Sequence, residues 1–181
     1  FIGMGQGVII GNAEKELKAF SEKAGVPTAS TVLGLSGLET SHPLNVGMVG
    51  MHGHYAPNIK TNDCDVFIAI GMRFDDRVTG DLSRYAKQAK VIHFEIDPAE
   101  VDKNVKTDVA VLGEVKETLT ALLPLIDKTT HTKWHQEFKD LYAIELEKVI
   151  KPQLEPTKTG LTMGEVLEGI NKETHGDAII V

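Results

Sequence analysis

With 181 residues, the chain is long enough for one compact core and a short appendage. Hydrophobic residues make up 41% and charged residues 25%, and no apolar run reaches the roughly 20 residues that cross a bilayer, so we expect a soluble protein without a membrane partner. The net charge of −7 argues against nucleic acid as a partner, because phosphate backbones are bound by clustered Lys and Arg.

The cysteine content indicates the cellular compartment, and the first residues indicate that the chain is part of a longer protein. The single cysteine, Cys64, cannot form an intrachain disulfide, which suits a reducing cytoplasm. We expect Cys64 to be a small buried residue at a strand entrance. Residues 1–5 contain no initiator Met, basic region or apolar signal core, so we expect the chain to begin inside a strand of a longer protein.

Short apolar runs alternate with stretches of helical spacing, which is typical of a parallel sheet flanked by helices. The predicted fold class is therefore α/β. A strand opens at Ile2 and ends in the glycine-rich turn 3–7. Asn12 is predicted to cap a helix over 13–23, which ends at Gly25.

Four more strands are predicted, at 26–32, 65–70, 90–96 and 108–112. The run 65–70 is continuously apolar, so we expect it to be buried on both faces. A short helix is predicted at 81–89 and a longer one at 114–123, closed by Pro124. The segment 33–54 is rich in glycine and turn residues and too long for an idle connector, so we expect a functional loop there.

The last third of the chain is predicted to contain two helices and a linker. Apolar residues recur at helical spacing over 132–150, and the polar, proline-containing segment 151–160 indicates a linker at a domain boundary. Another amphipathic helix is predicted at 162–173, followed by a β-prone run at 178–181. The predicted domains are residues 1–150 and, after the linker, residues 161–181.

Ligands of doubly wound sheets bind beyond the carboxyl ends of the strands, so residues that follow strands are the site candidates. The turn 3–7 would let backbone amides approach a phosphate, but it lacks the Gly-x-Gly-x-x-Gly spacing. An ordinary tight turn explains it about as well.

The segment 47–54 places three glycines beside two methionines and two histidines, which would let a planar ligand lie close to the backbone. A metal site at His52 and His54 is the alternative, disfavoured because no Cys or carboxylate cluster is near in sequence. His131 and His135 lie one helical turn apart, but an exposed helix face explains them better than a metal does. No metal ligands are therefore predicted.

The run 71–77 is the sharpest local signal, with two arginines and two aspartates around Phe74 just beyond a predicted strand. The planar, permanently charged guanidinium suits phosphates and carboxylates, so one arginine could bind a pyrophosphate and the other a substrate carboxylate. A mutual ion-pair cluster is an equally good interpretation.

Two acidic residues follow the next strands. Glu95, at the end of a predicted strand, is well placed to accept hydrogen bonds from ribose hydroxyls, and Glu114 follows the next strand in the same way. Glu114 could equally stabilise a helix N-terminus through the macrodipole.

Five segments together resemble the middle domain of FAD-dependent acetolactate synthases, also called acetohydroxyacid synthases. They are residues 27–31, 50–53, 73–77, 95–97 with Lys103 and Asn104, and 177–180. The run Arg-Phe-Asp-Asp-Arg is the most specific, since thiamine enzymes that share the fold without the flavin site generally lack it. The resemblance implies a doubly wound, six-stranded parallel sheet, a Rossmann-like domain of the DHS-like NAD/FAD-binding kind. It also implies FAD extended across the carboxyl edge, with a structural rather than a redox role.

By matching position, the resemblance implies a flavin site lined by Gly7, Thr31, Val32, Val49, Gly50, Met51, His52, Gly71, Met72, Arg73, Phe74, Asp75, Glu95, Ile96, Glu114 and Val115. It places Met51 and Arg77 by the substrate channel, where Arg77 would favour the second 2-keto acid through its carboxylate. Val8 departs from the pattern, because many relatives have three glycines where this chain reads Gly7-Val8-Ile9.

The reaction implied by the resemblance belongs to branched-chain amino acid biosynthesis and uses thiamine diphosphate and Mg. Pyruvate is decarboxylated to a hydroxyethyl carbanion, which attacks a second pyruvate or 2-ketobutyrate. The residues that activate thiamine and hold Mg belong to the flanking domains, so we expect no catalytic residue in this chain and no activity from it alone. Residues 161–181 would begin the C-terminal thiamine diphosphate-binding domain.

The resemblance further implies a homo-oligomer of catalytic subunits and allows a regulatory small subunit as a partner. Two other functions stay open. One is an NAD- or FAD-dependent redox module, and the other is a cofactor-free domain that serves as a scaffold or subunit interface.

Overall fold

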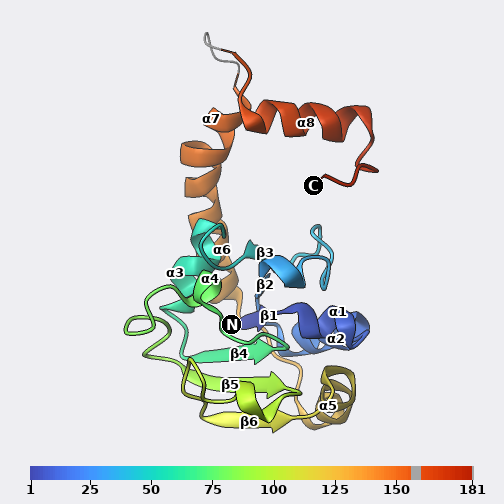
Figure 1. The fold of residues 1–181 in the computed structure, drawn as a ribbon, viewed down its shortest axis with the longest axis vertical. Coiled ribbons are helices and arrows are strands. Elements are labelled where there is room, and N and C mark those ends of the chain that lie inside the picture. The colour runs from blue at the N-terminus through green and yellow to red at the C-terminus, as the bar shows by residue number, and fades with distance from the viewer. Residues whose placement is uncertain (156–159, 181) are drawn as a thin grey trace. The chain divides into compact units, whose positions relative to one another are not determined.

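In the computed structural model, which describes residues 1–155 and 160–180, the chain divides into two units, Phe1–Lys139 and Asp140–Val181. The first unit contains every strand of the described sheet and the helices that cover it (Figure 1). The second contains the end of one long helix and two further helices.

Six parallel strands form one sheet in the order β3-β2-β1-β4-β5-β6. They are β1 (Ile2–Met4), β2 (Thr28–Ser30), β3 (Asn45–Met48), β4 (Val66–Ile70), β5 (Lys90–Glu95) and β6 (Val109–Leu112). The chain moves outward from β1 to β3 and then returns to the other side of β1, so the strand order reverses between β1 and β4. This is the order of a doubly wound, Rossmann-like sheet, and the predicted fold class is confirmed.

The register places the carboxyl ends of the strands at one level. Met4 pairs with Ser30 on one side and with Ile70 on the other, and Ile70 pairs with Phe94. Turns that leave these strands therefore meet along one edge of the sheet.

Helices follow most of the strands. They are α1 (Gln6–Ile10), α2 (Glu14–Ala24), α3 (Tyr55–Thr61), α4 (Asp76–Thr79), α5 (Val115–Leu122), α6 (Thr132–Glu145), α7 (Lys151–Leu154) and α8 (Met163–Glu173). Three short 3-10 turns, η1 (Val32–Gly34), η2 (Pro98–Glu100) and η3 (Leu123–Leu125), and a π-helical turn, η4 (Leu146–Ile150), complete the set. Figure 1 shows α1 and α5 beside the carboxyl ends of the strands.

The two faces of the sheet pack against different side chains, aliphatic on one face and aromatic on the other. On one face, alternate strand residues such as Ile2 and Ile70 join a buried aliphatic cluster with Leu17 of α2 and Leu119 of α5. On the other face, Phe67 of β4 stacks with other aromatic rings, with centroids 5.6 Å from Phe1 and 5.9 Å from Phe74. β4 is therefore packed on both faces, as expected, although Val66 and Ile68 are only partly buried.

The helices with clear apolar periodicity form where they are predicted. α2 matches the predicted helix 13–23, and its end at Gly25, which has a left-handed φ of 61°, is confirmed. α5 matches the predicted 114–123, with a 3-10 turn around Pro124. The N-cap of α2 is not Asn12 but Ala13, because Asn12 itself turns through a φ of 49°.

Three other predictions are wrong in detail. The turn 3–7 is instead the end of β1 followed directly by the first turn of α1. The predicted strand 26–32 pairs only over Thr28–Ser30. The segment 33–54 is not only a loop, because it contains the half-buried edge strand β3 and ends shortly before α3.

The helix predicted at 81–89 does not form. The Asp81 carboxylate accepts hydrogen bonds from the backbone and hydroxyl of Ser83, at 2.9 and 2.6 Å, which closes a local turn instead. Ala86 then adopts a φ of 47°, and its N–H donates to Asn62 Oδ1 at 2.8 Å. Tertiary contacts with the end of α3 thus override the local helical spacing.

In the second unit, α8 confirms the helix predicted at 162–173, and Thr162 caps it through a reciprocal pair of hydrogen bonds with Glu165. The first residues of the predicted linker are helical in α7, and residues 156–159 of that linker lie outside the described part. Residues 178–180 form no strand, and Val181 also lies outside the described part. The division into domains at 151–160 stays a prediction. Within the described chain, no helix combines the length and apolar character of a membrane span.

Candidate functional site

A groove with a volume of about 880 Å³ runs along the carboxyl edge of the sheet in the first unit. Residues that follow all six strands line it. Every residue predicted for the flavin site and the substrate channel lies in its lining except Gly50. Gly5, Gln6 and Asp76, from the candidate turn 3–7 and the run 71–77, also lie in the lining, and the lining residues that the sequence did not single out are Ile10, Gly11, Leu33, Val78 and Glu100. Several of these lie on or beside α1 and η1, two short elements without a periodic signal.

The glycines after β1 and β4 let two backbones meet at the point where the strand order reverses. Gly7 N–H donates to Gly71 O at 3.0 Å, and a Cβ on Gly7 would lie 2.7 Å from Gly71 Cα. A Cβ on Gly5 would lie 2.2 Å from Gly71 O. Backbone packing therefore accounts for these glycines without any ligand.

Val8, the departure from the resemblance, belongs to the aliphatic core and is fully buried. Its side chain points away from the groove, whose lining does not include it. The substitution therefore does not obstruct the groove.

The turn after β3 is tied to the rest of the site by hydrogen bonds. Gly50, with a φ of 104°, exchanges two hydrogen bonds of 2.9 Å with the Asn58 side chain. A Cβ on Gly50 would lie 2.7 Å from Arg77 O, so only glycine allows this approach to α4. Gly50 thus lies behind the groove, where it fixes the position of the residues that line it.

Met51 and Arg77, the two residues predicted for a substrate channel, lie side by side. Met51 N–H donates to Arg77 O at 2.8 Å, and 61% of Met51 and 74% of the Arg77 side chain are exposed. The two side chains are free to contact a ligand at the β3 side of the groove.

Two of the histidines weighed as metal ligands, His54 in this turn and His135 in α6, are engaged in hydrogen bonds within the fold. His54 Nδ1 accepts a hydrogen bond from Met48 N–H at 3.0 Å, which occupies one ring nitrogen. His135, in α6, uses Nε2 to donate to Gly25 O at 2.8 Å. Across residues 1–155 and 160–180, no three His, Cys, Asp or Glu side chains gather closely enough to hold a metal ion.

Among the described residues, the ionic partners of the two arginines in the 71–77 run are loose. Arg73 Nε lies 3.9 Å from Asp75 Oδ2, and Arg77 Nε lies 4.0 Å from Asp76 Oδ2. Both separations exceed those of hydrogen-bonded pairs, and exposed pairs of this kind contribute about 0–1 kcal/mol. Asp75 instead caps α4, accepting from Arg77 N–H at 3.0 Å. The guanidinium groups are therefore open to an anion, and a tight mutual cluster is not formed.

Phe74 borders the groove, but its ring does not face it. The side chain is 2% exposed and stacks edge-on against Tyr85 and His93. Its carbonyl accepts a hydrogen bond from Asn104 Nδ2 at 2.9 Å, which links the run 71–77 to the segment that follows η2. Phe74 thus anchors the turn in the core.

Carboxylates lie at the other side of the groove. Glu95 Oε1 accepts from the N–H groups of Ile96 and Asp97 at 2.8 and 3.1 Å, and Oε2 lies 3.6 Å from the buried His93 Nε2. Glu114 is the N-cap residue of α5, but its side chain makes no capping hydrogen bond. The carboxylates that follow β5 and β6 both line the groove.

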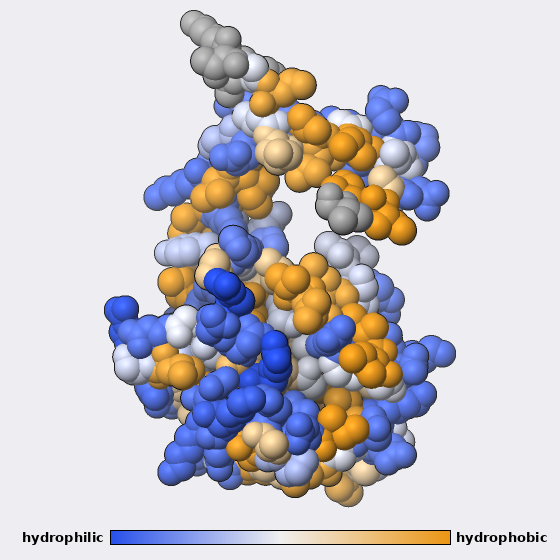
Figure 2. Space-filling view, in the orientation of Figure 1, coloured by the Kyte–Doolittle hydropathy of each residue, from blue (hydrophilic) through white to orange (hydrophobic). Residues whose placement is uncertain are grey.

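Large apolar side chains complete the lining. Ile10, Val32, Leu33 and Ile96 are all more than half exposed. Figure 2 shows hydrophobic surface over η1 and α1. Apolar walls with a few charged groups are typical of sites for small organic ligands.

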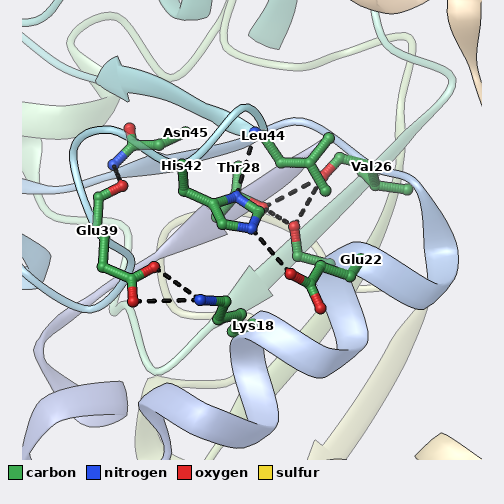
Figure 3. A network of polar contacts seen from close by, with 9 residues as sticks. Lys18, Glu22, Val26, Thr28, Glu39, His42, Leu44 and Asn45 are labelled. Carbon is green, nitrogen blue, oxygen red and sulfur yellow. Dashed lines mark hydrogen bonds and ion pairs between the residues drawn. The ribbon is translucent and has the colours of Figure 1, made fainter.

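A polar network behind the groove holds the approach to β3 against α2 (Figure 3). His42 Nε2 contacts Glu22 Oε1 at 3.0 Å, and Nδ1 accepts from Leu44 N–H at 3.2 Å. Since Nδ1 accepts, Nε2 carries the proton and donates to Glu22. Lys18 of α2 pairs with Glu39, three residues before His42, at 3.0 Å. The network helps to place β3, and with it the turn that carries Met51.

Comparison with known proteins gives a consistent result. Residues 1–122 match the family described as "Thiamine pyrophosphate enzyme, central domain". The "Probable acetolactate synthase large subunit" of Methanocaldococcus jannaschii is 44% identical over 158 residues, which are 82% of this chain and 27% of the relative. The "Acetolactate synthase large subunit" of Lactococcus lactis is 39% identical over 179 residues, 98% of this chain and 30% of the relative. The chain thus spans under a third of the length of these two relatives.

Proposed function

Because the chain belongs to the family of thiamine pyrophosphate enzyme central domains, and corresponds to that part of acetolactate synthase large subunits, we propose that it binds FAD as the middle domain of such a synthase. The whole enzyme would condense two pyruvates, or pyruvate and 2-ketobutyrate, with loss of CO₂. Thiamine diphosphate and Mg would be held by domains outside this chain.

The observation that carries the proposal is a single groove that crosses the ends of all six strands and contains two open guanidinium groups. FAD is an extended molecule with a central diphosphate, a ribose and two ring systems. Arg73, which follows β4 beside the reversal of strand order, would bind the diphosphate. Glu95 and Glu114 would accept hydrogen bonds from hydroxyl or amino groups of the nucleotide half.

The flavin half would lie on the β1–β3 side, against the apolar side chains of Val32 and Met51. There FAD would supply a planar surface beside the substrate channel rather than electrons. Arg77 would contribute its permanent positive charge to hold the carboxylate of the second 2-keto acid. Since Met51 and Arg77 are already joined by a backbone hydrogen bond, flavin and substrate would lie on neighbouring residues.

Titration with FAD tests this proposal against its two alternatives. We expect quenching of flavin fluorescence by the parent chain, and binding at least about tenfold weaker for Arg73→Gln, because a charge-assisted hydrogen bond is lost. Arg84→Gln is the control, since the Arg84 side chain is also exposed but lies outside the groove. Preference for NAD would favour a redox module, and binding of neither nucleotide would favour a cofactor-free scaffold.

A further inference from the structure

His93 is a fully buried histidine beneath the groove, on β5, that the proposed binding of FAD does not use. Its Nε2 lies 2.8 Å from the carbonyl oxygen of Met72. Because a carbonyl only accepts, Nε2 carries a proton, and in the neutral ring Nδ1 is then the bare nitrogen. Nδ1 has no hydrogen-bond partner within residues 1–155 and 160–180.

A buried nitrogen without a partner lowers stability, and an aliphatic side chain of similar volume would avoid that loss. His93 is therefore a poor choice for packing alone. The features that an aliphatic residue could not supply are the hydrogen bond from Nε2 to Met72 O at 2.8 Å and the longer approach of Nε2 to Glu95 Oε2 at 3.6 Å; the first is the closer contact.

That hydrogen bond holds one end of a strained turn. Phe74, two residues after Met72, has a φ of 54°, a left-handed conformation that is unfavourable for an aromatic residue. The His93 ring also contacts the Phe74 ring edge-on, with centroids 5.0 Å apart. Asn104 binds the Phe74 carbonyl from the other side at 2.9 Å.

Arg73 lies in sequence between Met72 and Phe74, both of which His93 contacts. Its side chain is 67% exposed and lines the groove, and its nearest ionic partner is 3.9 Å away. Within the part of the chain that the structure describes, no close ionic partner therefore sets the position of the guanidinium. The orientation of Arg73 depends on the backbone of Met72 and Phe74. His93 contacts the Met72 carbonyl and the Phe74 ring.

We propose that His93 is a positioning residue, which sets the Met72–Phe74 turn so that Arg73 meets an anionic group of the ligand in the groove. This inference rests on the proposed function, in which that group is the diphosphate of FAD. The general reason is that a binding group held in place before the ligand arrives does not have to be ordered on binding.

Two substitutions separate the roles of the two ring nitrogens. His93→Gln places an amide N–H group near the position of Nε2, so it can still donate to Met72. His93→Asn is shorter and places its amide near Nδ1, so it cannot reach that carbonyl. Val91→Ala is the control, because Val91 is buried on the same strand and the same face but outside the groove lining.

Hydrogen–deuterium exchange over residues 71–79 measures the turn without any ligand. We expect exchange there to be at least about tenfold faster in His93→Asn than in the parent, and within about threefold of the parent in His93→Gln. Val91→Ala should not accelerate exchange selectively in this segment. FAD affinity should follow the same order, at least about tenfold weaker for Asn and nearly restored for Gln.

The outcomes distinguish this inference from the proposed function. Equal exchange over 71–79 in the parent and in His93→Asn would overturn the positioning role even if the parent binds FAD. A parent chain that binds no FAD would contradict the proposed function, while the exchange measurement would still decide the role of His93. If His93→Asn does not fold, His93→Leu makes the same comparison, because it removes the donor without adding an unpaired polar group.

Discussion

Glycines at the ends of β1 and β4 are explained by packing within the fold as well as by ligand binding. They are Gly5, Gly7 and Gly71. Their backbones approach so closely that a single added methyl group would collide with backbone atoms. Gly50 has the same role against α4. Glycines at the strand ends of such a sheet are therefore evidence of close backbone contact before they are evidence of a ligand. The exposed, loosely paired arginines report more directly on a ligand.

Cys64 supports a prediction about alkaline pH. It is buried just before β4, as expected, and its Sγ–H donates to Thr61 O at 3.3 Å. Burial raises the pKa of the Cys64 thiol from 9.0 to about 11. The folded chain therefore keeps this proton to higher pH than the unfolded chain, so the stability that it contributes is complete below pH 9.0 and is lost as pH rises toward 11.

Between pH 9.0 and about 11, the free energy of unfolding should fall by about 1.4 kcal/mol per pH unit through this group. Urea unfolding of the parent and of Cys64→Ala at several pH values, under reducing conditions, measures it. Comparing the two removes the contribution of Tyr85, whose pKa burial also raises. A stability difference between parent and variant that stays constant above pH 9.0 would contradict the prediction.

At the scale of elements, the docking of α6 depends on one buried cation of α3. Lys60 Nζ lies 2.7 Å from Glu137 Oε2, 3.1 Å from Asp63 Oδ2 and 4.5 Å from the centroid of the Trp134 ring. Burial lowers the pKa of Lys60, but the hydrogen bonds to Glu137 and Asp63 outweigh that effect and raise the pKa above its usual value. The charge is thus retained and joins α3 to the first turns of α6.

We expect Lys60→Met to lower the free energy of unfolding by about 2 kcal/mol, because two charge-assisted hydrogen bonds and a cation–π contact are lost. Trp134 is the only tryptophan of the chain, so its fluorescence reports directly on the release of α6. Lys15→Met on α2 is the control, since Lys15 is exposed. Unchanged stability and fluorescence in Lys60→Met would show that α6 docks without this cation.

The elements differ in how well the sequence predicts them, for physical reasons. α2 and α8 have apolar periodicity and clear end signals, Gly25 for one and the Thr162 capping pair for the other, so local information is enough. α1 and β3 are short and contain glycine, and they form because neighbouring backbone is already in place. The predicted helix at 81–89 fails because Asn62, from another part of the chain, binds Ala86. The site residues were named mainly through a family resemblance, and no local pattern would have brought Glu114 and Met51 to one groove.

At the scale of the whole molecule, the strand order accounts for the location of the groove. Reversal between β1 and β4 sends successive connections to opposite sides, so the turns after these strands diverge and leave a crevice at the carboxyl edge. The matched family region, residues 1–122, contains the entire groove lining. A ligand-binding role can therefore reside in the first unit alone.

We predict that this chain does not catalyse acetolactate formation by itself. The chain spans 27–30% of the length of two acetolactate synthase relatives, and the proposed sites for thiamine diphosphate and Mg lie in the remainder. Without thiamine diphosphate there is nothing to stabilise the carbanion left when pyruvate loses CO₂. We therefore expect no acetolactate from the 181-residue chain even with pyruvate, FAD, thiamine diphosphate and Mg supplied. Colorimetric detection of acetolactate checks this, with a full-length acetolactate synthase as the positive control. Product above the protein-free blank would mean that this domain carries catalytic groups which its described residues do not suggest.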